Sequence, residues 1–321
     1  MNGNREGGLL LNTHIDHINK ASDKIMEIMK EAINNTNEFC SEKILTRGGR
    51  VGSGMGTLLE ALWGFNMNQI LLSQGTIDYE IGWFPDNEYN DFACVKKDTL
   101  WEPSERRGEL FRIEIKSMNK LADEAKGHFD EIIQNLGLHD LLVVLLWSWK
   151  SDNGTHYYPY IEDYFIGNAI EIAKLRDELH VKRGGWFIVP NSCPDNCKNC
   201  THIGEPINAK NIRERSSGPE SCKPNKSTKA SNFGGLVRML KTSNDNMRHA
   251  FRKIRKENDT ANRYITFIHT NFPAEEENQY TAGEWFKLAE KLGVKKGKNK
   301  KETIKVIREQ RQEYRETLRY L

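Results

Sequence analysis

Two acids and a lysine between Ile77 and Lys116 have a spacing that could support hydrolysis. Asp91 heads a short apolar segment, and Glu114 and Lys116 follow after a gap of 22 residues. Two carboxylates held close together repel each other, and burying either one alone is costly. A divalent cation such as Mg2+ relieves both problems because it favours oxygen ligands. The ammonium group of Lys116 could then orient or deprotonate a water, so these groups could hydrolyse a phosphodiester.

Three consecutive strands are predicted to position these residues. Alternating apolar and polar residues predict strands over Ile77–Phe84, Asp91–Lys97 and Leu110–Lys116. The period of two in the last strand places Glu114 and Lys116 side by side on one face, together with Arg112. The opposite, apolar face consists of Phe111, Ile113 and Ile115.

An acid followed by Glu114-Ile-Lys116 on a strand meander resembles the PD-(D/E)xK nuclease motif, and its surroundings resemble those of type II restriction endonucleases. The resemblance implies that Asp91 and Glu114 hold Mg2+ and that Lys116 activates the attacking water. A second acid–any–lysine triplet, Glu124-Ala-Lys126, falls in a segment with a helical pattern, and no strand-borne acid precedes it at a suitable distance. The first triplet is therefore the candidate.

The first metal ligand has three candidates. Asp91 ranks first because it heads an apolar strand, where the family places its ligand. Asp86, in the literal Pro-Asp pair, ranks second, and Asp78 ranks third because it is further from the motif. The resemblance also gives a role beside the metal to a glutamate of an early helix, and Glu60 in the predicted helix Thr57–Phe65 fits that role.

The order of elements predicts an α/β (α+β) protein with a mixed central sheet flanked by helices, similar to the restriction endonuclease core over about residues 55–190. Leu141–Trp149 is nearly all apolar and predicts a strand buried on both faces. The remaining predicted helices are 12–43, Lys120–Leu136 and Asp163–Leu179, and the last predicted strand of this part is Gly185–Val189.

Four of the six cysteines gather in a segment that is poor in apolar residues. Such a segment needs a staple, and four thiolates can close a tetrahedral zinc site. His202 is an alternative to the last cysteine. The predicted ligands of a structural Zn2+ are Cys193, Cys197, Cys200 and Cys222. The isolated Cys40 and Cys94 are predicted to be buried core residues.

Positive charge is concentrated in the C-terminal third. Residues 210–263 hold 14 Lys/Arg against 5 Asp/Glu, and residues 293–321 hold 10 against 4, although the whole chain has a net charge of only +2. This segregation suggests a polyanionic partner. Basic helices are predicted over 233–256, with these side chains outward: Arg238, Lys241, Arg248, Arg252, Lys253, Arg255 and Lys256. A strand is predicted over Tyr264–His269.

The tail reads as a helix, a lysine-rich extended turn and a second helix, which resembles SAP-like DNA-binding modules; packing between subunits is the alternative. Three parts follow: 1–190 with the nuclease core, 191–272 with the zinc and basic segments, and 273–321 with the helical module.

The expected function is a Mg2+-dependent type II restriction endonuclease that cuts double-stranded DNA as a homodimer, because two active sites are needed for two strands. The alternatives are a repair or recombination nuclease of the same fold and a zinc-containing DNA-binding protein that does not cut. The longest apolar run, Leu141–Trp147, is too short to span a bilayer, so we expect a cytoplasmic protein without a membrane partner.

Overall fold

The computed structural model of the chain describes residues 3–47, 54–75, 77–84, 90–121, 129–187, 205–207, 235–241, 245–272 and 282–319. Two helices, α1 (Gly3–Lys43) and α2 (Met55–Ser73), precede the sheet. α1 confirms the helix predicted over 12–43 from apolar residues at helical spacing, and α2 contains the helix predicted over Thr57–Phe65 and extends beyond it at both ends. The apolar positions of α1 that are buried include Ile18, Ile25, Ile28, Met29 and Ile33.

The centre of the fold is a five-stranded sheet in the order β1-β2-β3-β4-β5. Its strands are β1 (Tyr79–Trp83), β2 (Phe92–Lys96), β3 (Glu109–Asn119), β4 (Leu141–Lys150) and β5 (Tyr158–Asn168). The pair β3/β4 is parallel and the other three neighbouring pairs are antiparallel. The predicted mixed sheet flanked by helices is therefore confirmed. A second, two-stranded sheet pairs β6 (Trp186–Phe187) with β7 (Pro206–Ile207).

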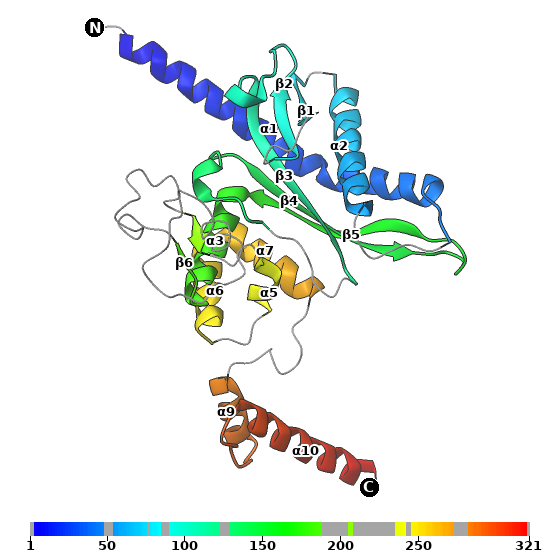
Figure 1. The fold of residues 1–321 in the computed structure, drawn as a ribbon, viewed down its shortest axis with the longest axis vertical. Coiled ribbons are helices and arrows are strands. Elements are labelled where there is room, and N and C mark those ends of the chain that lie inside the picture. The colour runs from blue at the N-terminus through cyan, green and yellow to red at the C-terminus, as the bar shows by residue number, and fades with distance from the viewer. Residues whose placement is uncertain are drawn as a thin grey trace, which may run out of the picture.

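Both faces of the sheet are covered, and β4 shows why. Its residues are apolar without interruption from Leu141 to Trp147, so alternate side chains can enter two separate cores. Leu141, Val143, Leu145 and Trp147 join the core under α1 and α2. Leu142, Val144 and Leu146 join the core under the later helices. Figure 1 shows α1 and α2 on one side of the sheet and α3, α5, α6 and α7 on the other.

The second helical layer contains α3 (Ala169–Lys182), α5 (Leu236–Leu240), α6 (Asp245–Glu257) and α7 (Asp259–Asn271). The prediction of a helix over Asp163–Leu179 is wrong in its first part, because β5 continues to Asn168. The side chain of Asn168 then accepts a hydrogen bond from the Glu171 N–H at 3.2 Å. This N-cap starts α3 at Ala169.

Tyr264–His269 is predicted as a strand and is instead part of α7. The side chain of Asn258 caps this helix by accepting from the Ala261 N–H at 2.8 Å. Aromatic and β-branched residues favour strands only weakly, and burial of one helical face outweighs that preference here. The buried residues of α7 are Ala261, Tyr264, Ile265, Phe267 and Ile268.

The helix predicted over Lys120–Leu136 is not found in the described residues 129–136, where only a 3₁₀ turn, η2 (Ile133–Asn135), is regular. Phe129 and Leu136 are buried, as the apolar pattern suggested, but on irregular backbone. The fully buried guanidinium of Arg176 donates to the carbonyl oxygen of Phe129 at 3.0 Å. A side chain of α3 thus bonds a backbone group that a helix would have bonded internally.

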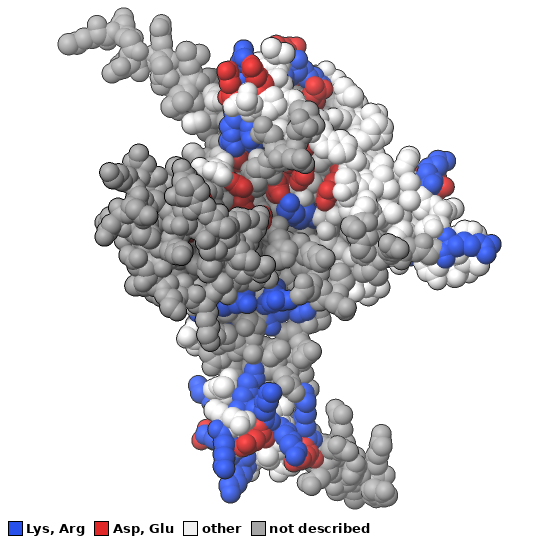
Figure 2. All heavy atoms as spheres, in the orientation of Figure 1, with Lys and Arg blue, Asp and Glu red and all other residues white. Residues whose placement is uncertain are grey.

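The tail contains two helices, α9 (Ala282–Lys291) and α10 (Lys300–Arg319), joined by a lysine-rich connection as predicted. They share a small core of their own, made by Trp285, Ala289, Val294, Ile304 and Ile307. Figure 2 shows mainly Lys and Arg on the visible surface of this module. Among the described residues, no helix is both long enough and apolar enough to cross a membrane.

Cys40 and Cys94 are buried free thiols, which confirms their prediction as core residues. The four proposed zinc ligands and His202 lie outside the described residues, so the zinc site stays a prediction.

Candidate active site

The candidate site is built on β3, whose two faces divide as the alternation predicts. Phe111, Ile113 and Ile115 enter the core under α1 and α2. Glu114 and Lys116 point to the opposite face, in register with Leu142 and Val144 of β4. In Figure 2, acidic side chains surround a basic one over this part of the sheet.

Glu114 is the most deeply buried acid of the motif, with 4% of its surface exposed. Its Oε1 forms an ion pair with Lys116 Nζ, while its Oε2 is buried and has no hydrogen-bond partner. Burial raises the pKa of Glu114 to about 8, with Asp91 and Asp130 adding to the rise and Lys116 opposing it. A buried carboxylate oxygen without a partner is costly. It is the kind of atom that a cation or a proton would stabilise.

Asp91 lies at the beginning of β2, opposite Glu114. The antiparallel register pairs Phe92 with Ile113, which places Asp91 level with Glu114. Asp91 Oδ2 accepts a hydrogen bond from the backbone N–H of Ile115 at 2.9 Å. Burial raises the pKa of Asp91, against the effects of this hydrogen bond and of the lysine of the motif. The first-ranked acid therefore lies beside the motif.

Of the two lower-ranked acids, Asp78 lies in the described part of the chain, and it is away from the motif. Asp78 precedes β1 and its Oδ1 lies 3.2 Å from His17 Nε2 on α1. Its backbone oxygen accepts a hydrogen bond from the N–H of Lys97, at the far end of β2 from Asp91. Asp86 lies outside the described residues, and so does the second triplet at 124–126.

Glu60 reaches the same strand from α2. Its Oε1 accepts a hydrogen bond from the backbone N–H of Ser117 at 3.2 Å. Gly56 lies about one helical turn before Glu60 and Gly64 about one turn after it, and both allow α2 to lie close to the sheet. A Cβ on Gly56 would lie 2.2 Å from Ser117 Oγ, and one on Gly64 would lie 2.6 Å from the Phe92 ring. Two glycines and a glutamate four residues apart on one helical face are a signal that the sequence analysis missed.

The carboxylates of Asp91 and Glu60 bind the edge of β3 beyond the part of the strand that pairs with β2. β2 begins at Phe92, opposite Ile113, so β3 continues beyond the pairing. The N–H groups of Ile115 and Ser117, two and four residues further on, each donate to a carboxylate instead of a strand carbonyl. Bare N–H groups at an edge are costly when buried, so both acids also stabilise the strand that carries the motif.

The charges of the site are coupled. Burial raises the pKa of Glu60, and Asp91 raises it further. Burial alone would lower the pKa of Lys116, but Glu114, Asp91 and Glu60 outweigh it and the pKa of Lys116 is raised. Lys116 is therefore a cation surrounded by three carboxyl groups, and its side chain is 30% exposed.

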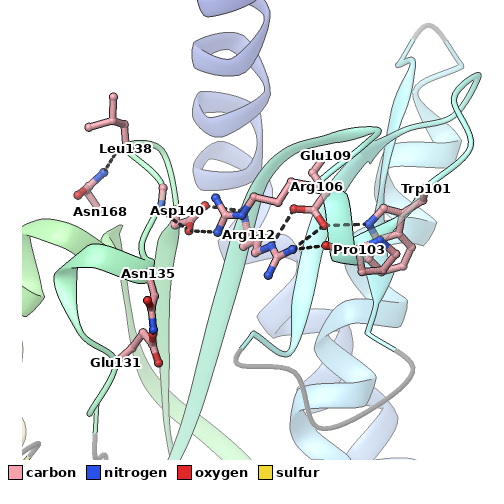
Figure 3. Close-up of polar contacts among 11 residues, drawn as sticks. Trp101, Pro103, Arg106, Glu109, Arg112, Glu131, Asn135, Leu138, Asp140 and Asn168 are labelled. Carbon is pink, nitrogen blue, oxygen red and sulfur yellow. Dashed lines mark hydrogen bonds and ion pairs between the residues drawn. The ribbon is translucent and has the colours of Figure 1, made fainter. Parts of the chain in front are cut away.

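A second buried acid, Asp140, fixes the beginnings of β3 and β4, and the sequence analysis did not identify it. Asp140 is 1% exposed and accepts from the N–H groups of Arg112 at 2.9 Å and Gly137 at 2.7 Å, and from the Arg106 guanidinium at 3.1 Å (Figure 3). Arg112 also bonds Glu109 at 2.8 Å. An acid directly before a continuous apolar run was the available signal, because such an acid becomes buried with the strand.

The donor set suits a hard divalent cation, although no three His, Cys, Asp or Glu side chains of the described residues form a ready group around one point. Asp91 and Glu114 offer carboxylate oxygens, and the unpartnered Oε2 of Glu114 is available as a ligand. Mg2+ is commonly held by one or two carboxylates, with water and substrate phosphate completing its shell. The residues present therefore fit Mg2+.

The basic stretch on α5 and α6 agrees only in part with its prediction. Arg248 is 8% exposed and packs inside the helical layer, so its predicted outward position is wrong. Met247 and Phe251 are core residues, and the helical period places Arg248 on the same buried side of α6. Arg252 is outward but pairs with Glu284 of α9 at 2.7 Å. Lys253 is exposed, with Glu257 at 3.9 Å.

Comparison of the chain with protein-family models, with curated proteins and with solved structures finds no match. The function is therefore argued from the residues and their geometry.

Proposed function

We propose that the protein is a Mg2+-dependent endonuclease that hydrolyses phosphodiesters of double-stranded DNA, of the type II restriction class. The observation that carries the proposal is the buried Glu114–Lys116 pair facing Asp91, with one oxygen of Glu114 left without a partner. Capping of the Ile115 N–H accounts for Asp91, but it does not account for a buried Glu114 oxygen without a partner. An acid, an acid and a lysine are the groups that phosphodiester hydrolysis requires.

Asp91 and Glu114 would hold the cation, which supplies positive charge for the phosphate and lowers the pKa of a bound water. Lys116, held as a cation by the three acids, donates a hydrogen bond to the attacking water or to a phosphate oxygen. Lys116 can act as a base only after its carboxylates are neutralised, because these acids raise its pKa. Water attacks phosphorus in line, the bond to the 3′ oxygen breaks, and that oxygen takes a proton. The products are a 5′-phosphate and a 3′-hydroxyl.

The positive C-terminal third supports DNA as the substrate, since Lys and Arg that contact phosphates supply affinity independent of sequence. Cleavage of both strands needs two sites, so we propose a homodimer. We also propose a structural Zn2+ bound by Cys193, Cys197, Cys200 and Cys222. Elemental analysis of the purified protein should then find about one zinc per chain.

Incubation of the purified protein with phage DNA, with and without Mg2+, tests the function. Discrete bands that require Mg2+ support a restriction enzyme. A smear indicates a non-specific or repair nuclease, and shifted but uncut DNA indicates a binding protein. Glu114→Gln and Lys116→Ala should each lower cleavage about 100-fold or more while DNA binding survives. Unchanged cleavage by both variants would place the active site elsewhere.

A further inference from the structure

The face of β3 that carries the motif continues past Lys116 to a second group of charges. Lys120 follows β3, and its backbone N–H donates to the Trp147 carbonyl of β4 at 2.8 Å. Its ammonium group forms an ion pair with Glu162 of β5. The hydroxyl of Ser148 on β4 donates to the other oxygen of Glu162 at 2.5 Å. Three neighbouring strands thus contribute to one polar cluster.

A lysine and a tyrosine extend this cluster toward the β4–β5 hairpin. Lys150 Nζ lies 3.6 Å from the centroid of the Tyr160 ring. Tyr160 pairs with Ser148 in the β4/β5 register, which places both on the same face. A cation over a tyrosine ring is a favourable contact that also holds the lysine in place. Lys120, Ser148, Lys150, Tyr160 and Glu162 together are named the hairpin face.

The apolar core under the later helices does not extend to the hairpin face. That core includes Leu146 of β4 and Phe165 of β5 but no residue of β4 after Leu146 and none of β5 before Phe165. Figure 1 shows β4 and β5 extending beyond α3, α5, α6 and α7. The Lys120 side chain is 40% exposed, and Lys150 is exposed.

The charges of this part of the sheet favour an anionic partner. The hairpin face holds two lysines, Lys120 and Lys150, against one acid, Glu162, which forms an ion pair with Lys120. The nearby Asp163 accepts a hydrogen bond from Asn271 of α7 at 2.5 Å. Burial opposes the ionisation of Glu162, but hydrogen bonds from Lys120 and Ser148 and the charge of Lys150 lower its pKa. Glu162 therefore remains ionised and neutralises part of the lysine charge.

We propose that the backbone of duplex DNA, on leaving the Glu114–Lys116 pair, passes over the hairpin face and contacts Lys120 and Lys150, an inference that rests on the proposed function. Four residues of strand separate Lys116 from Lys120, or about 13 Å. That length matches roughly four base-pair steps along a duplex. The ion pair with Glu162 fixes the position of Lys120. Glu162 also weakens DNA binding, because its carboxylate competes with phosphate for the lysines.

The test measures affinity for a duplex of about 30 base pairs in EDTA, which prevents cleavage, by fluorescence anisotropy over a range of salt concentrations. Lys120→Gln and Lys150→Gln should each weaken binding several-fold and make the slope of log affinity against log salt shallower by about one unit. Glu162→Gln should tighten binding several-fold, because it removes the ion-pair partner of Lys120 and the negative charge that offsets Lys150. A merely structural role for Glu162 predicts the opposite sign.

Lys24 and Glu27 provide the matched control, since they form an ion pair of 3.1 Å on α1, on the other side of the sheet. Lys24→Gln and Glu27→Gln should leave affinity and salt slope unchanged. The proposal is overturned if Glu162→Gln fails to tighten binding. It is also overturned if Lys120→Gln and Lys150→Gln bind DNA as the Lys24→Gln control does, provided that melting curves show both variants to be folded. Uncut DNA with the expected affinity changes would contradict the nuclease function alone. Absence of duplex binding by the unmodified protein would contradict both.

Discussion

The carboxylate of Asp91 accepts a hydrogen bond from the backbone N–H of Ile115 at 2.9 Å, and so joins the beginning of β2 to the strand that carries the catalytic candidates. The same carboxylate is the first-ranked metal ligand. Asp91 therefore has a structural role in this structure and a catalytic role in the proposal. Substitutions that differ in hydrogen bonding but not in charge can separate the two.

Asp91→Asn keeps an oxygen that can accept from Ile115 but removes the negative charge. We expect this variant to fold with nearly unchanged stability and to lose cleavage. Asp91→Ala removes both properties, and an unsatisfied buried N–H should lower the free energy of unfolding by about 1–3 kcal/mol. Urea unfolding and a plasmid cleavage assay measure the two effects. Asp78→Asn is the control and should cut normally; an inactive Asp78→Asn beside an active Asp91→Asn would show that the ranking is wrong.

The approach of α2 to β3 predicts the effect of adding one methyl group. Gly56→Ala would place Cβ 2.2 Å from Ser117 Oγ, so the Ser117 hydroxyl must rotate away or α2 must move from β3, which would draw Glu60 away from the Ser117 N–H. Overpacking of this kind should cost about 1–3 kcal/mol of stability. Gly283→Ala is the control, because a Cβ there meets no atom within 4 Å. Thermal unfolding of both variants measures the difference.

A second substitution tests whether the clash is the cause. Ser117→Ala removes the Oγ, and the next nearest atom to a Cβ on Gly56 is the Ser117 Cβ at 3.5 Å, an ordinary contact. The double variant Gly56→Ala, Ser117→Ala should therefore recover most of the stability lost by Gly56→Ala. Failure to recover it would mean that Gly56 is required for some other reason, such as the start of the helix.

The local pattern of β3 predicted the positions of Glu114 and Lys116 correctly, because the alternation of a strand decides which residues share a face. Contacts between distant segments were not predictable in this way. The contacts of Asp140 and Gly56 depend on the β3/β4 pairing and on how α2 crosses the sheet. Local patterns mark both residues but do not identify the residues that they contact. The errors at Asp163–Leu179 and Tyr264–His269 have a more local origin, since both helices begin at asparagine caps that were not recognised.

The raised pKa of Glu114 predicts a dependence of stability on pH in the absence of divalent cation. Between the ordinary value of 4.5 and about 8, the folded protein retains a proton on Glu114 that the unfolded chain loses. The free energy of unfolding must then fall as pH rises through this window. The contribution of Glu114 is fully present below about pH 4.5. The raised pKa values of Asp91 and Glu60 act in the same direction.

Urea unfolding in EDTA from pH 5 to 8.5 measures this dependence, and Glu114→Gln should flatten it. Binding of Mg2+ to the ionised carboxylate should release a proton below about pH 8, so metal affinity should rise with pH up to that value. Calorimetric titration in buffers of different ionisation enthalpy detects the proton. An equally steep stability profile for Glu114→Gln would assign the dependence to other groups.

The C-terminal module should affect DNA affinity without affecting the fold of the sheet. α9 and α10 have their own core, and the exposed Arg252–Glu284 pair links α9 to α6. An exposed pair of this kind contributes only about 0–1 kcal/mol. Deletion of residues 280–321 should therefore leave the unfolding transition of the remaining chain nearly unchanged. The deletion should also weaken duplex binding and make the slope of log affinity against log salt shallower, because it removes a net charge of +6 within 293–321.

A charge variant of the whole chain distinguishes phosphate contact from subunit packing by this module. Lys295 and Lys298 are exposed in the turn between α9 and α10, so Lys295→Gln with Lys298→Gln should preserve the module and its core. Contact with phosphates predicts weaker binding with a salt slope shallower by about two units. Light scattering of both proteins reports their oligomeric state. If the deletion produces monomers while the charge variant binds DNA normally, the module belongs to the dimer interface and its assignment to DNA is wrong.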